Sequence, residues 1–242
     1  MNLLSQITPY NTDAGKKKEV EDMFDNIAPK YDLLNHVLSM KIDVLWRNTL
    51  VKWMSKDVPK EVLDVATGTG DLAIAVQKGT GADVVGLDLS QQMLNVGIDK
   101  IKKLNLDAKI SMQKGDAENL PFDNNKFDAV SVAFGVRNFE NLEKGLSELR
   151  RVVKENSSVY ILEFSKVEGF FGPLYMFYFK NILPQIGKLV SKDNRAYTYL
   201  PDSVNAFPFG EKMKSILLNT GFRKVEYKKQ SLGIATIYKA TK

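Results

Sequence analysis

Short apolar segments separated by helical patterns constrain the fold of this chain more than any other feature. Five of these segments are rich in β-branched or aromatic residues and alternate little between apolar and polar positions: residues 61–66, 83–88, 109–116, 127–134 and 158–164. Such runs are typical of parallel strands that are covered on both faces. The segments between them, such as residues 72–79 and 142–154, have helical spacing. This succession predicts a doubly wound α/β sheet.

The pattern changes near the C-terminus. Residues 222–230 and 234–241 both have the composition of strands, and only Ser231, Leu232 and Gly233 separate them. A short connection that contains glycine favours a hairpin. We therefore expect the mostly parallel sheet to finish with a C-terminal antiparallel hairpin.

The chain has 242 residues, of which 44% are hydrophobic, and this suffices for the core of one large α/β domain. We expect a single domain with four parts: a helical N-terminal cover (1–58), a cofactor-binding core (59–165), a lid insertion (166–205), and a C-terminal helix and hairpin (206–242). In an open α/β sheet, ligands bind beyond the carboxyl ends of the strands. The N-terminal extension and the insertion are therefore expected to roof the site.

Composition excludes several kinds of chemistry. The chain has no cysteine and a single histidine, so thiolate sites and cysteine nucleophiles are excluded, and we predict no metal. It also lacks the apolar stretch of a signal peptide or a membrane span, which indicates a cytoplasmic protein. The net charge of +5 and the basic clusters at residues 16–18 and 100–103 permit an anionic partner, although a solvated basic face is the simpler interpretation.

A glycine loop points to a nucleotide. The sequence GTGDLA at residues 68–73 satisfies the pattern G-x-G-x-x-A, and Asp88 ends the next predicted strand. This combination fits a nicotinamide dinucleotide or S-adenosylmethionine. Asp64 and Asp71 flank the loop with carboxylates, which would repel a pyrophosphate and suit the ammonium and sulfonium groups of S-adenosylmethionine. We therefore predict a class I S-adenosylmethionine-dependent methyltransferase with a Rossmann-like sheet.

The same residues suggest how this cofactor is held. Gly68 and Gly70 are expected to let the backbone approach the methionine part, and Asp88 to accept hydrogen bonds from the ribose hydroxyls. Asp116 ends the third predicted strand, and the apolar turn at residues 117–122 is suited to lie against adenine.

Two motifs are more specific than the glycine loop: FDNIAPKYDLLNHVLSM at residues 24–40 and FGVRNF at residues 134–139. With them, the chain resembles the UbiE/MenG family of quinone-biosynthesis C-methyltransferases over nearly its whole length. Members often have serine where this chain has Ala133, so a cofactor contact at this position would be through the backbone. The resemblance implies that cofactor contacts fall on four positions: Thr69, Asp88, Asp116 and Ala117.

The resemblance also implies a reaction, which is methylation of a ring carbon in a polyprenylated quinol. Demethylmenaquinol is the favoured substrate, and 2-methoxy-6-polyprenyl-1,4-benzoquinol of ubiquinone biosynthesis is the alternative. A nucleic-acid methyltransferase is more distant, because residues 134–139 are not the Asn-Pro-Pro-aromatic turn that grips an extruded base. We expect no nucleic acid partner.

A prenylated substrate resides in the bilayer. We therefore expect transient contact with an anionic membrane surface, with the protein peripheral on the inner face of the membrane. The sequence leaves the oligomeric state open, a homodimer included.

Arg137 and Asn138 follow the fourth predicted strand, beside the methyl-transfer position of this architecture. We predict that they stabilise a phenolate, and the alternative for Arg137 is a structural ion pair. His36 is a candidate base because histidine titrates near neutral pH, and the alternative is a surface position.

The substrate pocket is expected to include Tyr31, Asp32 and Tyr197. Tyr199 is a similar candidate, with ordinary core packing as the alternative for both later tyrosines. Residues 170–191 are aromatic-rich and are interrupted by a lysine and a proline, and we predict that they form a lid over the prenyl tail.

Overall fold

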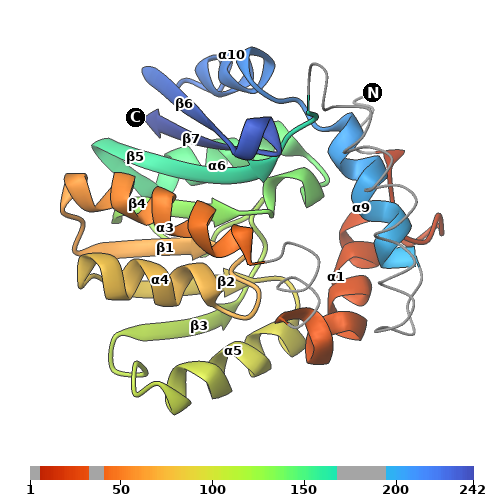
Figure 1. Cartoon of the computed structure of the whole chain (residues 1–242), viewed down its shortest axis with the longest axis horizontal. Helices are drawn as coiled ribbons and strands as arrows, with labels where there is room; N and C mark the ends of the chain where they lie inside the picture. Colours follow the sequence, from red (N-terminus) through yellow and green to blue (C-terminus); the bar gives the residue numbers. More distant parts are fainter. Residues whose placement is uncertain (1–5, 33–40, 168–194) are drawn as a thin grey trace.

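The structure is a computed structural model that describes residues 6–32, 41–167 and 195–242, except for the side chains of residues 195–198. Its centre is a seven-stranded sheet in the order β3-β2-β1-β4-β5-β7-β6 (Figure 1). The strands are β1 (Glu61–Val65), β2 (Asp83–Asp88), β3 (Ile110–Lys114), β4 (Phe127–Ala133), β5 (Val153–Phe164), β6 (Lys224–Gln230) and β7 (Ala235–Thr241).

Strands β1 to β5 are parallel to one another, whereas β7 is antiparallel to both β5 and β6. This arrangement confirms the predicted doubly wound sheet and its C-terminal hairpin. The strand boundaries agree with the predicted segments to within two residues, except that β5 begins at Val153, although the apolar run began at residue 158 and the helical pattern extended to residue 154. Val153 is fully buried and pairs with Phe127 of β4, so pairing in the sheet ends the helix there.

Helices cover both faces of the sheet. The described helices of the core and the C-terminal region are α4 (Asp71–Thr80), α5 (Gln91–Lys103), η4 (Val136–Asn138), α6 (Leu142–Val152), α9 (Arg195–Ala206), α10 (Glu211–Asn219) and η6 (Ser231–Gly233). Alternate residues of β1 face opposite layers. Leu63 packs in a cluster with residues of α6 and α10, whereas Val62 packs with residues of α3 (Ile42–Met54) and α4.

The N-terminal region is helical where it is described, with α1 (Lys16–Ile27), η2 (Ala28–Lys30), α3 and η3 (Ser55–Asp57). In Figure 1, α1 and α9 lie beyond the ends to which the parallel strands point. Val20 and Met23 of α1 pack in one cluster with Met93 of α5 and Tyr199 of α9. Helix α1 therefore covers the carboxyl edge of the sheet, whereas α3 packs on one face of the sheet beside α4.

Most of the predicted lid lies at residues 168–194, outside the described residues. Among the residues that are described, no helix has the length and apolar character to cross a bilayer.

Candidate active site

The loop after β1 is shaped by two glycines and a buried acid. Gly68 and Gly70 have φ angles of 57° and 81°, in the left-handed region that glycine adopts without strain. Asp64 of β1 is 1% exposed and accepts hydrogen bonds from the hydroxyls of Thr67 at 2.6 Å and Ser131 at 2.7 Å. Burial raises the pKa of the Asp64 carboxyl to about 6, although both hydroxyls favour its charged form. Asp64 therefore fastens the loop to the neighbouring strand β4.

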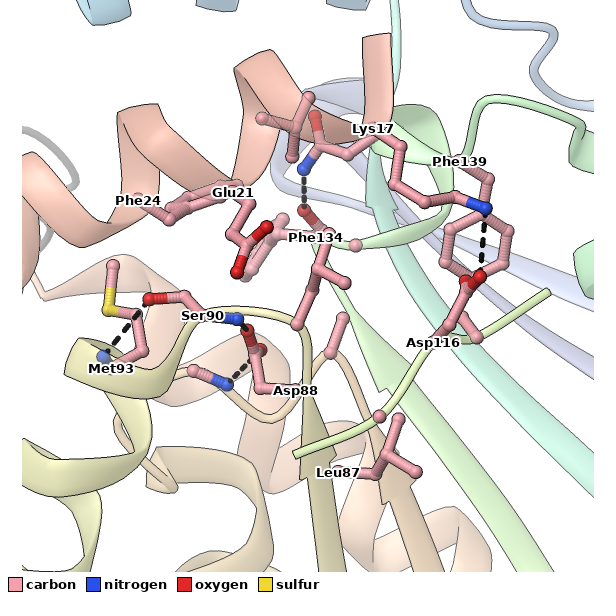
Figure 2. Close-up of a pocket in the computed structure, with 18 of the residues that line it drawn as sticks. Lys17, Glu21, Phe24, Leu87, Asp88, Ser90, Met93, Asp116, Phe134 and Phe139 are labelled. Carbon is pink, nitrogen blue, oxygen red and sulfur yellow. Dashed lines mark hydrogen bonds and ion pairs between the residues drawn. The ribbon is translucent and has the colours of Figure 1, made fainter. Parts of the chain in front are cut away.

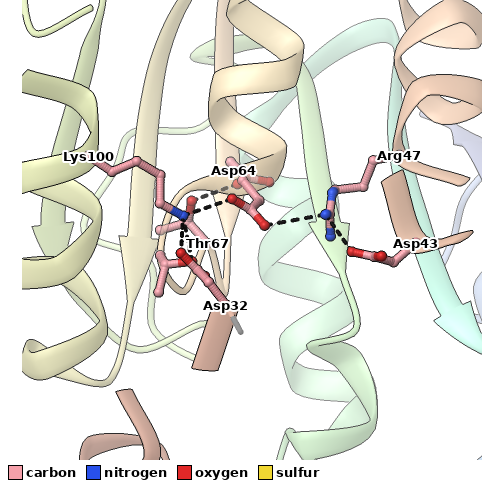
Figure 3. Close-up of polar contacts among 8 residues, drawn as sticks. Asp32, Asp43, Arg47, Asp64, Thr67 and Lys100 are labelled. Atoms are coloured by element: carbon pink, nitrogen blue, oxygen red, sulfur yellow. Dashed lines mark hydrogen bonds and ion pairs between the residues drawn. The ribbon is translucent and has the colours of Figure 1, made fainter. Parts of the chain in front are cut away.

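Asp71 opens α4 directly after the loop. Its carboxylate binds the ammonium of Lys100 at 2.8 Å and the guanidinium of Arg47 at 3.3 Å. Both cations are labelled in Figure 3. Neither Asp64 nor Asp71 is among the described residues that line the pocket at this edge of the sheet. The expectation that both carboxylates face a cationic cofactor is thereby corrected, because both are engaged within the protein.

Asp88 ends β2 and lines the pocket. Its carboxylate accepts hydrogen bonds from the backbone amides of Gly68 at 2.8 Å and Ser90 at 2.9 Å (Figure 2). Burial raises the pKa of the Asp88 carboxyl, and the backbone donors oppose this effect. The acid thus joins the glycine loop to the start of α5, and each oxygen retains a lone pair for a further donor.

Asp116 lies after β3, on another side of the same pocket, and Ala117 lines the pocket next to it. One carboxylate oxygen of Asp116 accepts the amide of Glu118 at 2.9 Å, and the other lies 2.8 Å from the ammonium of Lys17 (Figure 2). The sequence did not single out Lys17 as a pocket residue, because nothing local to α1 reveals its partner after β3.

Aromatic side chains supply the apolar part of the pocket wall. They come from α1, from the end of η2 and from the segment after β4: Phe24, Tyr31, Phe134 and Phe139. Phe134 has a φ of 58°, which a bulky residue adopts only where the surrounding structure enforces it. Acids at two strand ends, with aromatic walls between them, suit an adenosine ligand.

The remaining predicted cofactor residues belong to the glycine loop itself. Of the three loop positions, Gly68 lines the pocket, whereas Thr69 and Gly70 do not among the described lining residues. The Thr69 hydroxyl donates a hydrogen bond to Asp32 at 2.5 Å. Tyr31 lines the pocket, while Asp32 is directed to the loop and to Lys100, and the role of both residues in substrate binding stays a prediction.

Arg137 and Asn138 form part of η4. The Arg137 guanidinium binds the carboxylate of Glu163 and the carbonyl of Phe134, and it is not among the described residues that line the pocket. Asn138 lines the pocket, and its side-chain oxygen accepts a hydrogen bond from the hydroxyl of Tyr199 at 3.0 Å. The geometry of Arg137 is that of the structural ion pair, and its catalytic role stays a prediction.

Two candidate residues lie outside what the structure describes. His36 falls in residues 33–40, and the side chain of Tyr197 is not described. Tyr199 is buried, at 4% exposure, and reaches the site through Asn138.

The fold and this site together define a class I S-adenosylmethionine-dependent methyltransferase. The chain is similar to a methyltransferase of this kind from Aquifex aeolicus, with 22% identity, 75% of this chain and 81% of that chain covered, and a TM-score of 0.55. A second solved structure is a putative methyltransferase from Methanococcus maripaludis, with 19% identity, 93% of each chain covered and a TM-score of 0.60. At these identities the likeness concerns the fold.

The chain belongs to the ubiE/COQ5 methyltransferase family, whose model matches residues 11–242. It is 47% identical to the demethylmenaquinone methyltransferase of Bacteroides fragilis, with 98% of both chains covered. It is 42% identical to the Porphyromonas gingivalis protein of the same name, again with 98% of both covered. It is also 42% identical to the ubiquinone/menaquinone biosynthesis C-methyltransferase UbiE of Geobacter sulfurreducens, over 98% of this chain and 93% of that one. The resemblance seen in the sequence motifs is thereby confirmed.

Proposed function

We propose that the protein transfers a methyl group from S-adenosylmethionine to a ring carbon of demethylmenaquinol. The observation that carries this proposal is a single pocket that holds both Asp88 and Asn138 between aromatic walls. Asp88 is suited to a ribose, and Asn138 is suited to a substrate oxygen. The choice of demethylmenaquinol is supported by the Bacteroides fragilis relative, and the alternative benzoquinol is supported by the Geobacter sulfurreducens relative.

The pocket residues fit the methyl donor. Asp88 would accept hydrogen bonds from the ribose hydroxyls, since it lines the pocket and its carboxylate has lone pairs beyond those that bind the backbone amides. Asp116 and Ala117 would hold the adenine, with Asp116 accepting from its exocyclic amine. When bound, S-adenosylmethionine supplies an electrophilic methyl group on a sulfonium.

The protein would have to promote loss of a phenolic proton from the quinol. The resulting phenolate places negative charge on the ring carbon, which then forms a bond to the methyl group as the bond from methyl to sulfur breaks. The ring carbon afterwards loses its own proton and the ring oxygen regains one, so that the aromatic quinol is restored. Positioning of the reacting atoms at about 3 Å in a dry pocket is the main requirement on the protein.

Asn138 and Arg137 are the proposed phenolate stabilisers. The Nε of Arg137 is a buried donor that has no hydrogen-bond partner within the described part of the chain, and because Arg137 does not line the pocket, a bridging water would have to connect it to a phenolate. Arginine stays protonated, so the base would be water or another residue, with His36 as the candidate.

The test is incubation of the purified protein with labelled S-adenosylmethionine and each reduced precursor in turn, followed by mass spectrometry of the extracted lipid. Label in menaquinol supports the proposal, and label only in the benzoquinol product moves the assignment to the alternative. If the protein binds the cofactor but neither lipid carries label, the proposed methylation of a quinol is contradicted.

We also propose transient attachment to an anionic membrane surface. Exposed Lys102 and Lys103 support it, whereas the cluster at residues 16–18 contributes less than its sequence suggests. Lys16 is 2% exposed and donates a hydrogen bond to the carbonyl of Arg137, and Lys17 is paired with Asp116. Sedimentation with neutral and anionic vesicles should show tighter binding to the anionic ones at low salt. Equal binding to both would contradict an electrostatic contribution.

A further inference from the structure

Behind the glycine loop, three carboxylates alternate with two cations. The Lys100 ammonium lies 2.6 Å from the carboxylate of Asp32 and 2.8 Å from that of Asp71 (Figure 3). Asp71 also binds Arg47, which in turn binds Asp43. These side chains range from 5% to 29% exposed, so water screens them only in part.

Lys100 joins parts of the chain that are far apart in sequence. It stands near the C-terminal end of α5, where a cation is favoured by the helix dipole. Asp32 directly follows Tyr31 at the end of the first N-terminal helices, and Asp71 is the first residue of α4. Lys100 also donates to the hydroxyl of Thr69 at 3.2 Å, and that hydroxyl donates to Asp32. One ammonium therefore fastens the N-terminal cover to the glycine loop.

The residues next to these contacts are pocket residues. Tyr31 precedes Asp32, and Gly68 precedes Thr69, and both line the pocket. If the ammonium were lost, the carboxylates of Asp32 and Asp71 would face each other without a cation between them, and like charges at such range repel. The cover would then separate from the loop and take the Tyr31 wall with it.

We propose that Lys100 is a positioning residue, which completes the cofactor pocket by docking residues 28–32 against the glycine loop. It acts through Asp32 and Thr69 and does not itself touch the cofactor. The identity of the pocket's ligand rests on the proposed function. The same charge cluster explains why Asp71 is tolerated at the start of α4, where the helix dipole usually favours an anionic ligand. The cations Lys100 and Arg47 neutralise the Asp71 carboxylate within the protein.

The first test measures S-adenosylmethionine affinity by calorimetry for Lys100→Met, Lys100→Arg and the matched control Lys102→Met on the same helix. Lys100→Met should weaken binding by about tenfold, as expected when one partner of a partly buried charge cluster is removed. Lys100→Arg should restore most of the affinity because it keeps the cation. Lys102 is exposed and has no ion pair with the described residues, so its variant should bind as the wild type does. Wild-type affinity in a folded Lys100→Met protein would overturn the proposal.

The second test asks whether Lys100 acts through Asp32. Asp32→Asn alone should also weaken binding, and the double variant with Lys100→Met should be no weaker than Lys100→Met alone. Fully additive losses would show that the two residues act independently and would overturn the proposal. If Lys100→Met fails to fold, Asp32→Asn and Lys100→Arg decide the same question.

Hydrogen exchange separates this proposal from the choice of cofactor. In the protein without ligand, Lys100→Met should speed amide exchange in peptides covering residues 24–32 and leave peptides of α6 unchanged. If the wild-type protein does not bind S-adenosylmethionine, the proposed function is contradicted. The exchange rates of residues 24–32 in the ligand-free wild type and Lys100→Met still test the docking role. Unchanged exchange in residues 24–32 would contradict the docking role.

Discussion

The Nη1 atom of Arg137 lies 2.8 Å from a carboxylate oxygen of Glu163, and the two side chains are 8% and 0% exposed. Glu163 also accepts the backbone amides of Arg137 and Phe164. Burial raises the pKa of the Glu163 carboxyl, and the Arg137 guanidinium opposes this effect. The pair therefore ties the turn after β4 to the neighbouring strand β5, directly behind Asn138.

Arg137→Ala should lower the free energy of unfolding by about 3–5 kcal/mol, because it leaves the Glu163 charge buried and unpaired. Denaturant unfolding measures this loss. The double variant Arg137→Met/Glu163→Gln should recover much of the stability, since no buried charge remains.

The same variants separate the two roles of Arg137. If its guanidinium stabilises a phenolate, the stable double variant should keep its cofactor affinity and lose about a hundredfold in turnover, the range for one oxyanion donor. Wild-type turnover in the double variant would assign Arg137 a purely structural role.

Asp88→Ala should weaken S-adenosylmethionine binding by at least about tenfold, because a charged acceptor for the ribose hydroxyls is lost. Asp83→Ala is the matched control, since Asp83 begins the same strand and is exposed, with its side chain 63% accessible. Calorimetry on both folded variants is the measurement. An unchanged dissociation constant for Asp88→Ala would take Asp88 out of the cofactor site.

Asp64 makes the stability depend on pH. Burial raises its pKa from 3.8 to about 6 in the folded protein, so the folded state binds more protons than the unfolded state between these values. The contribution of Asp64 to the free energy of unfolding is therefore complete below about pH 4, and about 3 kcal/mol of it is lost as the pH rises through 6.

Asp64→Asn removes this titration. The stability of the variant relative to the wild type should therefore improve from pH 4 to pH 8 in chemical unfolding experiments. A constant difference across this range would mean that Asp64 does not titrate as its burial implies.

Turnover should require the reduced substrate. A quinone ring is electron-poor and cannot attack a methyl group on a sulfonium, whereas the quinol can lose a phenolic proton. The protein has no cysteine, so a thiol reductant should affect only the substrate. Activity with demethylmenaquinone in the absence of any reductant would contradict the proposed chemistry.

The doubly wound sheet and the approximate positions of its strands along the chain could be predicted from the sequence, because buried parallel strands leave continuous apolar runs. Pocket positions at strand ends, such as Asp88 and Asp116, followed from the same pattern. Charge partners did not follow, because they come from distant segments: Asp71 meets Lys100 and Arg47, and Arg137 meets Glu163.

Glu163 is one buried charge whose need for a partner is visible in the sequence. It is an acid within the apolar run at residues 158–164, and a charge in such a strand needs a buried partner. The sequence predicts a surface position for Lys16, because it belongs to a basic cluster, but the structure buries its side chain. Burial lowers its pKa to about 8, and Arg137 adds to this effect.

The position of the transferred methyl group shows directly whether the protein methylates a ring carbon of the quinol. The protein would be incubated with demethylmenaquinol, a reductant and S-adenosylmethionine carrying ¹³C in its methyl group, and the extracted lipid examined by NMR. We expect one ¹³C signal at the chemical shift of a methyl group on an aromatic carbon, and a signal at least about tenfold weaker when Asp88→Ala replaces the wild type at a limiting cofactor concentration. A signal at the shift of a methoxy group, or label in no lipid at all, would contradict carbon methylation of the quinol.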